Sequence, residues 1–337
     1  MLTPLISYSN LDELKVALSA AGIQFDSRLG DRLHEKGLPP LTSSHVFGFI
    51  LGVSPKIITF MAKKPDKFYR SFPIKKRSGG IRRILAPRTY LKVIQRYILG
   101  NILEKQSFPK CVTAFTKKRG IVQNASYHVG ARFLLNVDLK DFFGSVKQHE
   151  VIQLLRNLGF SSNNMAELLA GLCTFGGSLP QGAPTSPALA NLVFAQVDQR
   201  ILGLCRSHKL KYSRYADDLT FSGRSQISSE FLVQLTNLLS RFGYEVNRKK
   251  VRFARPGQAK FVTGMIINEK VQPQRASRRR LRAMFHQSSR NAKSLRLEQV
   301  AQLQGWASFV NSYDQRKGKE YFKVLSAIRM EKARRPS

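Results

Sequence analysis

The sequence predicts an α+β fold, with a small sheet of short strands among helices. Short apolar runs of strand type lie in the middle of the chain, where tight turns and helical stretches join them. The stretches before and after this region have apolar residues at helical spacing. Hydrophobic residues make up 42% of the 337 residues, which is enough to fill the cores of two or three compact subdomains.

The chain is strongly basic, with 56 Lys and Arg against 21 Asp and Glu and a net charge of +35. Because like charges repel each other within a compact protein, an excess of this size indicates a polyanionic partner. Nucleic acid is the usual one, whereas an anionic membrane is disfavoured because no strongly amphipathic anchor is evident. Charge alone does not distinguish an enzyme from a binding module.

The sequence also indicates a soluble, cytoplasmic protein. No run of 18 or more apolar residues is present, and the N-terminus lacks the basic-then-apolar pattern of a signal peptide. The three cysteines, Cys111, Cys173 and Cys205, are an odd number at unrelated spacings. We therefore expect neither a disulfide framework nor a zinc site. A reducing compartment is expected instead.

The first 65 residues are expected to form a small helical scaffold. Asn10 can cap a helix whose apolar face begins with Leu11 and Leu14. Further helices are expected over residues 43–51 and 55–61, the second opened by a proline at its first position.

A basic hairpin is expected next. Two short apolar runs flank Ser78-Gly79-Gly80, a turn sequence that favours a hairpin. Five cations surround its tip: Lys75, Lys76, Arg77, Arg82 and Arg83. A solvated turn would account for them, and so would a flexible hairpin that closes over a triphosphate. A helix is expected to follow over residues 90–106.

The central region alternates strands and helices. A buried-type strand over residues 133–137 carries Asp138 at its end, and a second hairpin over 211–222 turns at Ala216-Asp217. The other expected elements are helices over 148–158 and 164–172, a helix that follows the loop 176–187 and ends near 202, a helix over 229–242, and strands near 244–246, 251–253 and 261–265. This order fits a split-βαβ, ferredoxin-like sheet. From Pro273 onwards the chain is expected to be helical and basic.

Three acidic residues stand out against this background. Asp138 ends an apolar strand and Asp217-Asp218 lie at a hairpin tip, so neither setting resembles a solvated face. Adjacent aspartates repel each other unless a cation lies between them, and Mg²⁺ suits such oxygen ligands. Two Mg²⁺ ions can activate an attacking oxygen and stabilise the leaving one in phosphoryl transfer. An Asp-Asp pair alone is weak support for such a metal site. The presence of Asp138 at the end of a separate strand strengthens the case.

Three segments make the chain resemble reverse transcriptases. Tyr215-Ala216-Asp217-Asp218 resembles their Tyr-x-Asp-Asp box, residues 179–187 (LPQGAPTSP) resemble their template- and nucleotide-positioning loop, and residues 138–143 (DLKDFF) resemble their first metal-binding strand. Order and spacing agree over roughly residues 70–270. The resemblance implies a right-hand polymerase with fingers, a ferredoxin-like palm and a helical thumb, which makes DNA on an RNA template.

Two further boxes are similar to those of bacterial retron reverse transcriptases. They are residues 124–128 (NASYH), like an Asn-Ala-x-x-His element, and residues 262–264 (VTG), like a Val-Thr-Gly element. The chain ends soon after the expected thumb helices, which argues against a complete group II intron protein. The expected subdomains are an N-terminal helical region (1–65), fingers (66–131), a palm (132–272) with a finger-like helical insertion at about 148–175, and a helical basic thumb (273–337).

The resemblance also implies roles for individual residues. Asp138, Asp217 and Asp218 would be the catalytic acids and, with the carbonyl of Leu139, would hold two Mg²⁺ ions. The residues expected to bind the nucleotide are Lys75, Arg82, Arg83, Phe142, Gln181, Gly182 and Lys250. Phe142 would be the steric gate against a ribose 2′-hydroxyl, although a phenylalanine after a strand is more often a core residue. Lys250 would lie near the leaving pyrophosphate, and a solvated charge run would explain it equally well.

RNA contacts are implied for the two boxes and for the thumb. The residues are Asn124, His128, Val262, Thr263, Gly264, Arg278, Arg279, Arg280 and Arg282. His128 could equally be structural. Trp306 and Phe309 are at helical spacing and are expected in the core of the thumb rather than as base-stacking platforms.

The implied function is that of a retron RNA-directed DNA polymerase. It would copy its own structured non-coding RNA, from an internal guanosine 2′-hydroxyl, into branched multicopy single-stranded DNA. Its implied partners are this RNA template-primer, the single-stranded DNA product, deoxynucleoside triphosphates and an effector protein of an antiphage defence complex, with no membrane. Two alternatives stay open: the reverse transcriptase of another bacterial element, intron-like or diversity-generating, and a catalytically idle RNA-binding scaffold.

Overall fold

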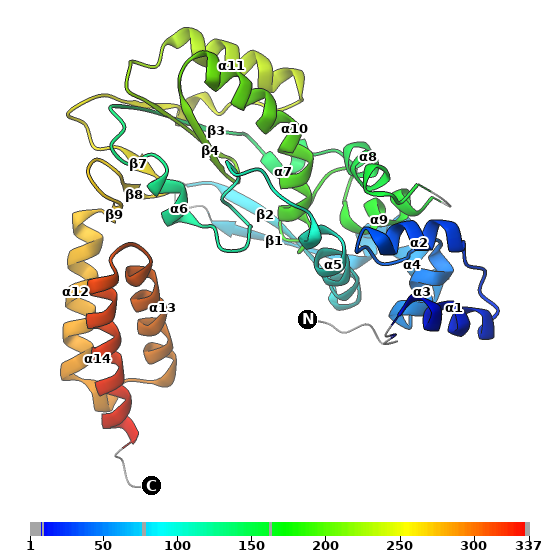
Figure 1. Ribbon diagram of the computed structural model, residues 1–337. Helices are drawn as coiled ribbons and strands as arrows, with labels where there is room; N and C mark the ends of the chain where they lie inside the picture. Colours follow the sequence, from blue (N-terminus) through cyan, green and yellow to red (C-terminus); the bar gives the residue numbers. More distant parts are fainter. Residues whose placement is uncertain (1–7, 9, 76–78, 162–163, 334–337) are drawn as a thin grey trace. The chain divides into compact units, whose positions relative to one another are not determined.

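The structure, a computed structural model, describes residues 8, 10–75, 79–161 and 164–333 (Figure 1). The chain forms two compact units, each made of three segments. Unit 1 comprises residues 1–115, 139–203 and 234–246, and unit 2 comprises residues 116–138, 204–233 and 247–337. These units cut across the expected fingers and palm, whose boundaries stay a prediction.

Unit 1 begins with four helices: α1 (Leu11–Ala20), α2 (Ser27–Glu35), α3 (Ser44–Leu51) and α4 (Pro55–Lys63). The side chain of Asn10 accepts a hydrogen bond from the backbone N–H of Glu13 (2.9 Å), and Ser43 caps α3 by accepting one from Val46 (3.2 Å). These caps confirm two of the expected helix starts, whereas α2 was not expected. Among the described helices, none is by itself long and apolar enough to cross a membrane, and α3 with α4 passes that test only as a pair bent by 111°.

The expected basic hairpin is present in unit 1. After a short 3₁₀ turn, η1 (Pro65–Phe68), β1 (Tyr69–Lys75) pairs antiparallel with β2 (Ile81–Pro87). The predicted tip residues Lys76 and Arg77 lie outside the described residues. Helix α5 (Thr89–Asn101) ends earlier than predicted, and a separate 3₁₀ turn, η2 (Leu103–Lys105), follows it.

Unit 1 also contains α7 (Phe142–Ser145), α8 (Gln148–Leu158), α9 (Met165–Cys173) and most of α10 (Ser186–Ser207), which continues into unit 2. Buried Gln95 of α5 holds two of the neighbouring elements. Its Nε2 donates to the hydroxyl of Tyr69 (2.7 Å) and to the carbonyl of Leu172 (2.8 Å). The start of β1 and the end of α9 are therefore fixed to the same helix.

A four-stranded antiparallel sheet forms the centre of unit 2. Its strands are β3 (Phe133–Asp138), β4 (Lys211–Tyr215), β5 (Asp218–Gly223) and β6 (Arg252–Ala254), in the spatial order β4-β5-β3-β6. Helices α8 to α10 separate β3 from β4 in the chain, and α11 (Ser229–Arg241) separates β5 from β6. This order and pairing confirm the predicted ferredoxin-like topology.

Two strand predictions were wrong. Residues 244–246 form only an isolated bridge between Val246 and Leu139, and a 3₁₀ turn, η3 (Arg248–Lys250), follows. Residues 261–265 form not one strand but the hairpin β7 (Phe261–Val262) and β8 (Met265–Ile266), which pairs with β9 (Gln272–Pro273). The chain reverses there because Thr263 and Gly264 have positive φ angles of 47° and 79°.

Three long helices follow as predicted: α12 (Arg275–Arg290), α13 (Leu297–Tyr313) and α14 (Gln315–Ala333), with a 3₁₀ turn, η4 (Ala292–Ser294), after the first. They share a hydrophobic core in which the rings of Phe285 and Tyr321 stack 3.9 Å apart. The prediction that Trp306 is a core residue was wrong, because it is 39% exposed. The buried face of α13 passes instead through Leu303 and Ala307.

Candidate active site

Three carboxylates gather at one end of the four-stranded sheet. Asp138, the last residue of β3, lies directly opposite Asp218, the first residue of β5, in the antiparallel ladder. Asp217 precedes it in the two-residue turn between β4 and β5. The fold therefore brings together acids from two segments that are far apart in the chain.

The turn that carries Asp217 holds an alanine in the left-handed conformation. Ala216 has φ +57°, which costs a residue with a Cβ about 1 kcal/mol or more. The conformation is kept because Tyr215 and Asp218 pair on either side of it. Buried Arg214 also donates a hydrogen bond to the Ala216 carbonyl (3.4 Å). Strain of this kind is typical of places where a fold must present particular side chains.

Asp138 is buried, and two residues at opposite ends of η3 hold its carboxylate. Asn247 donates from Nδ2 to Oδ2 (3.2 Å), and the Lys250 ammonium donates to Oδ1 (2.7 Å). The backbone N–H of Asn247 also donates to the Asp138 carbonyl (2.7 Å). The hydrogen bond to Asp138 raises the pKa of Lys250. Lys250 therefore places a positive charge directly beside Asp138, and its role near the leaving group stays a prediction.

The other two acids repel each other and Asp138. The pKa of Asp218 is raised to about 6, first by desolvation of its carboxyl group and then by the charges of Asp217 and Asp138, which Lys250 opposes. The residue as a whole is solvent-exposed, so the repulsion between the carboxylates outweighs the desolvation of its carboxyl group. A cation bound between these carboxylates would remove that repulsion.

The donor atoms of this group fit a hard divalent cation. Carboxylate oxygens under mutual repulsion are the ligands that Mg²⁺ prefers, and Mg²⁺ leaves room for phosphates. Within the part of the chain that the structure describes, however, no three His, Cys, Asp or Glu side chains form a ready-made metal cluster. The carboxylate of Asp138 is instead engaged by Asn247 and Lys250.

The basic hairpin presents its cations on two faces. Arg83 lies opposite Pro73 in the register, whereas Arg82 lies opposite Ile74. Because side chains alternate along a strand, Arg82 and Arg83 point to opposite faces, and Lys75 shares the face of Arg83. All three cations are exposed. One face can thus offer Arg83 and Lys75 together to an anion.

The loop that carries Gln181 and Gly182 is fastened to β2. The backbone N–H of Leu85 donates to the Gln181 carbonyl (2.7 Å). Gly182 has φ +123°, and a Cβ there would lie 2.8 Å from both the Leu85 carbonyl oxygen and the Ile84 side chain. Glycine is therefore required by backbone conformation and by space together.

Phe142, the predicted steric gate, is buried at 3% exposure in an aromatic cluster. Its ring packs against those of Phe194 (5.6 Å between centroids) and Tyr244 (6.2 Å). The next residue, Phe143, is only half-buried. A gate must be reachable by the sugar of the nucleotide, so burial favours Phe143 over Phe142, and the gate role itself stays a prediction.

Asn124 and His128 are fully buried, at α6 (Ile121–Ser126) and just after it. Ser213 donates to Oδ1 of Asn124 (2.6 Å), so it accepts from Nε2–H of His128 (2.7 Å), and Nδ1 of His128 accepts from Ser222 (2.7 Å). Burial, with the nearby charge of Lys211, lowers the pKa of His128 to about 3. This network of neutral groups fixes α6 to β4 and β5. Its inward orientation favours a structural role, and the predicted RNA contact stays untested.

The second box packs against the first. Val262 is buried in a cluster with Val122 and Ala125 of α6, and the hydroxyl of Thr263 donates to the carbonyl of Ile121 (2.9 Å). Gly264, at the turn, is exposed. The two boxes therefore form one packed module, with α6 held both by the sheet and by the β7–β8 hairpin.

The arginines predicted to bind RNA lie on α12. Arg279, Arg280 and Arg282 are exposed, and Arg278 is partly buried. Among the described residues, the buried Nε of Arg278 has no hydrogen-bond partner. The exposed three are free to meet phosphates, and their role stays a prediction.

Three residues that sequence reasoning did not assign belong to this region: Asn247, Ser213 and Ser222. Asn247 was visible only as the start of a basic run. Ser213 and Ser222 share the sheet face of Asp218 by the strand register. Polar residues at buried strand positions were the signal that could have identified them.

Comparisons with known proteins identify the family of this chain. The reverse transcriptase (RNA-dependent DNA polymerase) family matches residues 74–293. The retron Ec86 reverse transcriptase of Escherichia coli is 33% identical over 312 residues, which is 90% of this chain and 95% of that protein. The retron Mx65 reverse transcriptase of Myxococcus xanthus is 37% identical over 283 residues, 77% of this chain and 66% of that protein. A solved structure of telomerase from Candida albicans with a TWJ fragment of telomeric RNA has a TM-score of 0.45 and 10% identity, with 78% of this chain and 59% of that chain covered. The retron relatives confirm the resemblance inferred from the motifs.

Proposed function

Because this chain belongs to the reverse transcriptase family of RNA-dependent DNA polymerases, we propose that Asp138, Asp217 and Asp218 are its catalytic acids. The chain is a retron RNA-directed DNA polymerase, and polymerases of this family generally use divalent metal ions. The observation that carries the proposal is the pairing of Asp138 with Asp218 across the sheet. It sets carboxylates from two strands at one sheet end, as a phosphoryl-transfer site requires.

The metal in this proposal is a pair of Mg²⁺ ions, held by Asp138, Asp217 and the carbonyl of Leu139, with Asp218 as a neighbouring acid. When bound, the ions supply charge that stabilises the attacking and leaving oxygens of phosphoryl transfer. Asn247 orients the Asp138 carboxylate through its 3.2 Å hydrogen bond. Lys250 donates to the other oxygen of that carboxylate (2.7 Å) and is the cation assigned to the leaving pyrophosphate.

The nucleotide is assigned to residues of unit 1. Arg83 and Lys75 share one hairpin face and suit the triphosphate, and Arg82, on the other face, suits a template phosphate better. Gln181 and Gly182 are assigned to the base pair that forms, because the loop that carries them is held rigidly on β2. Positioning of this kind is most of what a protein contributes to phosphoryl transfer.

Replacing both hairpin acids tests the proposal. The double variant Asp217→Ala, Asp218→Ala should abolish primer extension on an RNA template, because the metal ligands are lost, and should leave RNA binding largely intact. Glu269→Gln, an exposed acid of unit 2, is the matched control and should extend normally. Synthesis at a tenth of the wild-type rate in the double variant would contradict the assignment.

The substrate in this proposal is a structured non-coding RNA encoded with the enzyme. Support comes from the retron relatives and from the net charge of +35. The product would be branched multicopy single-stranded DNA, started from an internal guanosine 2′-hydroxyl. With its RNA, its DNA and an effector protein, the enzyme would act in antiphage defence in the cytoplasm.

Sequencing the nucleic acid that co-purifies with the protein tests the substrate. A single RNA species joined to single-stranded DNA through a 2′-linkage is the expected result. RNA without attached DNA, from protein that cannot extend a primer, would instead support an idle scaffold. DNA copied from many unrelated RNAs would favour another bacterial element.

A further inference from the structure

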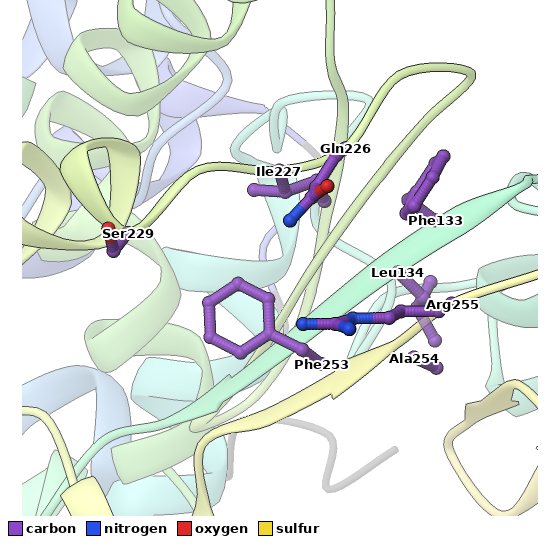
Figure 2. A pocket seen from close by; sticks show the side chains of 8 residues that line it. All are labelled: Phe133, Leu134, Gln226, Ile227, Ser229, Phe253, Ala254 and Arg255. Carbon is purple, nitrogen blue, oxygen red and sulfur yellow. The ribbon is translucent and has the colours of Figure 1, made fainter.

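A hollow of about 310 Å³ lies in unit 2 between the sheet and the loop that follows β5. Phe133 of β3 and Phe253 of β6 contribute aromatic rings, and Gln226 and Ile227 come from the loop. In Figure 2, Phe253 of β6 and Arg255, which follows β6, project toward the side on which Gln226 and Ser229 lie. The size is at the lower end of the range for small-ligand pockets, so it suits one ring system rather than a polymer.

This hollow is separate from the three acids. Asp138 is at the last position of β3 and Phe133 at the first, so the whole strand, roughly 17 Å, lies between them. The register also puts Phe133 and Phe253 with Leu135 on one face of the sheet, and Asp138 with Asp218 on the other. A duplex at the acids would therefore lie on the face opposite the Phe133 and Phe253 rings, although Leu134 and Ala254, which also line the hollow, are on the face of the acids.

The groups around the hollow are those that bind an unpaired base. Phe253 is 43% exposed, which leaves much of its ring free for stacking. The amide of Gln226 can pair with a base edge, and the guanidinium of Arg255 can stack on a base or bind a phosphate. An apolar surface patch would not require a guanidinium and an amide beside its two aromatic rings. The combination therefore favours a ligand-binding site.

Charge favours an anionic ligand at the same place. The segments that frame the hollow, residues 132–134, 224–230 and 252–255, contain four arginines (Arg132, Arg224, Arg252 and Arg255) and one acid, Glu230. All four arginines are exposed. Within the described part of the chain, none of these four is in an ion pair with an acid. Phosphates on either side of a bound base would supply the missing negative charge.

We propose that this hollow binds an unpaired nucleobase, with its neighbouring phosphates on the surrounding arginines, in a segment of single-stranded nucleic acid outside the duplex that is being extended. Phe253 stacks on the base, Gln226 contacts its edge and Arg255 binds a flanking phosphate. Single-stranded RNA and single-stranded DNA share this chemistry. The site does not depend on the assignment of the three acids.

The test uses the full chain loaded with a short, blunt RNA–DNA hybrid that occupies the extension site. Fluorescein-labelled 12-mers of oligo(U) and oligo(dT) are then titrated in separate arms, and their anisotropy is followed. Wild-type protein should bind at least one of the two oligonucleotides. The one that binds more tightly shows whether RNA or DNA is the ligand of the site. Phe253→Ala should weaken binding about tenfold, the loss expected for one stacked base. Arg255→Gln should reduce the slope of log affinity against log salt concentration by about 0.7, which is the value for one phosphate contact of a single strand.

Matched controls separate this site from the general basic surface. Tyr90→Ala and Arg28→Gln remove an exposed aromatic and an exposed arginine in unit 1 and should bind like wild type. Oligonucleotides with 4-thiouridine or 4-thiothymidine should crosslink to the peptide that contains Phe253. No binding to hybrid-loaded protein, equal loss in the controls, or crosslinks that avoid this peptide would each overturn the proposal. Loss of single-nucleotide extension in Phe253→Ala would also overturn it, because the site would then belong to the extension machinery.

Discussion

Phe142 and Phe143 are neighbours with different surroundings, which bears on how the polymerase selects deoxynucleotides. Phe142 fills an aromatic cluster, whereas Phe143 is only half-buried. Phe143→Val should therefore admit ribonucleotides, with discrimination reduced by about tenfold or more, because a smaller side chain leaves room for the 2′-hydroxyl. Comparison of kcat/KM for dNTPs and rNTPs measures this.

Phe142→Val is the matched variant. It should cost about 2 kcal/mol of unfolding free energy, since it leaves a cavity among aromatic rings, and should keep sugar selectivity. If Phe142→Val relaxes selectivity and Phe143→Val does not, the original assignment of the gate to Phe142 holds.

His128 should make the stability of the protein depend on pH. Its pKa is about 3 in the folded protein and near 6.5 when unfolded, so between these values the unfolded state binds more protons. The stabilisation that comes from keeping His128 neutral is complete above pH 6.5. It is lost as the pH falls below this value, by up to about 1.4 kcal/mol per pH unit. Urea unfolding at several pH values between 6.5 and 5 gives the slope of the unfolding free energy against pH. In His128→Gln this slope should be smaller than in the wild type by the equivalent of up to one proton.

Exposed His149 provides the control for this experiment. His149→Gln should keep the wild-type pH slope, because its side chain lies in solvent and not in the buried network that holds His128. An unchanged slope in His128→Gln would mean that the imidazole is not held neutral in the folded protein.

At the scale of elements, the loop after α9 and the strand β2 approach each other so closely that a glycine is required. Gly182→Ala should reduce nucleotide incorporation strongly and raise KM for the dNTP, because a Cβ 2.8 Å from the Leu85 carbonyl forces the loop away from β2. Steady-state extension assays give both values.

Gly177→Ala separates the two reasons for a glycine in this loop. Gly177 also has a positive φ, of 75°, but its Cβ would meet nothing within 4 Å. This variant should cost about 1 kcal/mol in backbone strain and little activity. Equal losses in the two variants would show that conformation alone, and not the approach of β2, explains Gly182.

Helix α6 is a short element with two attachments. The Asn124–His128 network joins it to β4 and β5, and Thr263 joins it to the β7–β8 hairpin. Two sequence boxes that are far apart in the chain therefore act as one structural module. Asn124 and His128 face inward, where hydrogen bonds to buried neutral groups contribute most to a unique packing.

At the scale of the whole molecule, the net charge of +35 predicts a strong dependence of RNA binding on salt. If the thumb and its surroundings make roughly six to ten phosphate contacts, affinity should fall by about three to five decades between 50 and 200 mM salt, because each contact releases condensed counterions. Filter binding across this range measures the slope. A slope near zero would mean that shape and base contacts, rather than phosphates, hold the RNA.

Several elements could be predicted because their signals are local. The Asn10 cap, the pairing of the β1–β2 hairpin and the apolar strand that ends at Asp138 each depend on a few neighbouring residues. The end of α5 and the lack of a strand over residues 244–246 could not be predicted. Tertiary contacts decide where a helix ends and whether an extended segment pairs with another strand. Trp306 was misplaced for a related reason: helical spacing defines a face, but only packing decides which face is buried.

The sequence by itself determined the family and most of the order of strands and helices, and it led to the proposal of the three acids, because motif spacing and hydrophobic periodicity are written along the chain. Tertiary structure alone decided that Asp138 opposes Asp218, that Lys250 and Asn247 engage Asp138, and that Asn124 and His128 face inward. The physical reason is that strand register and side-chain burial depend on residues distant in sequence. No local pattern contains that information until the sheet has formed.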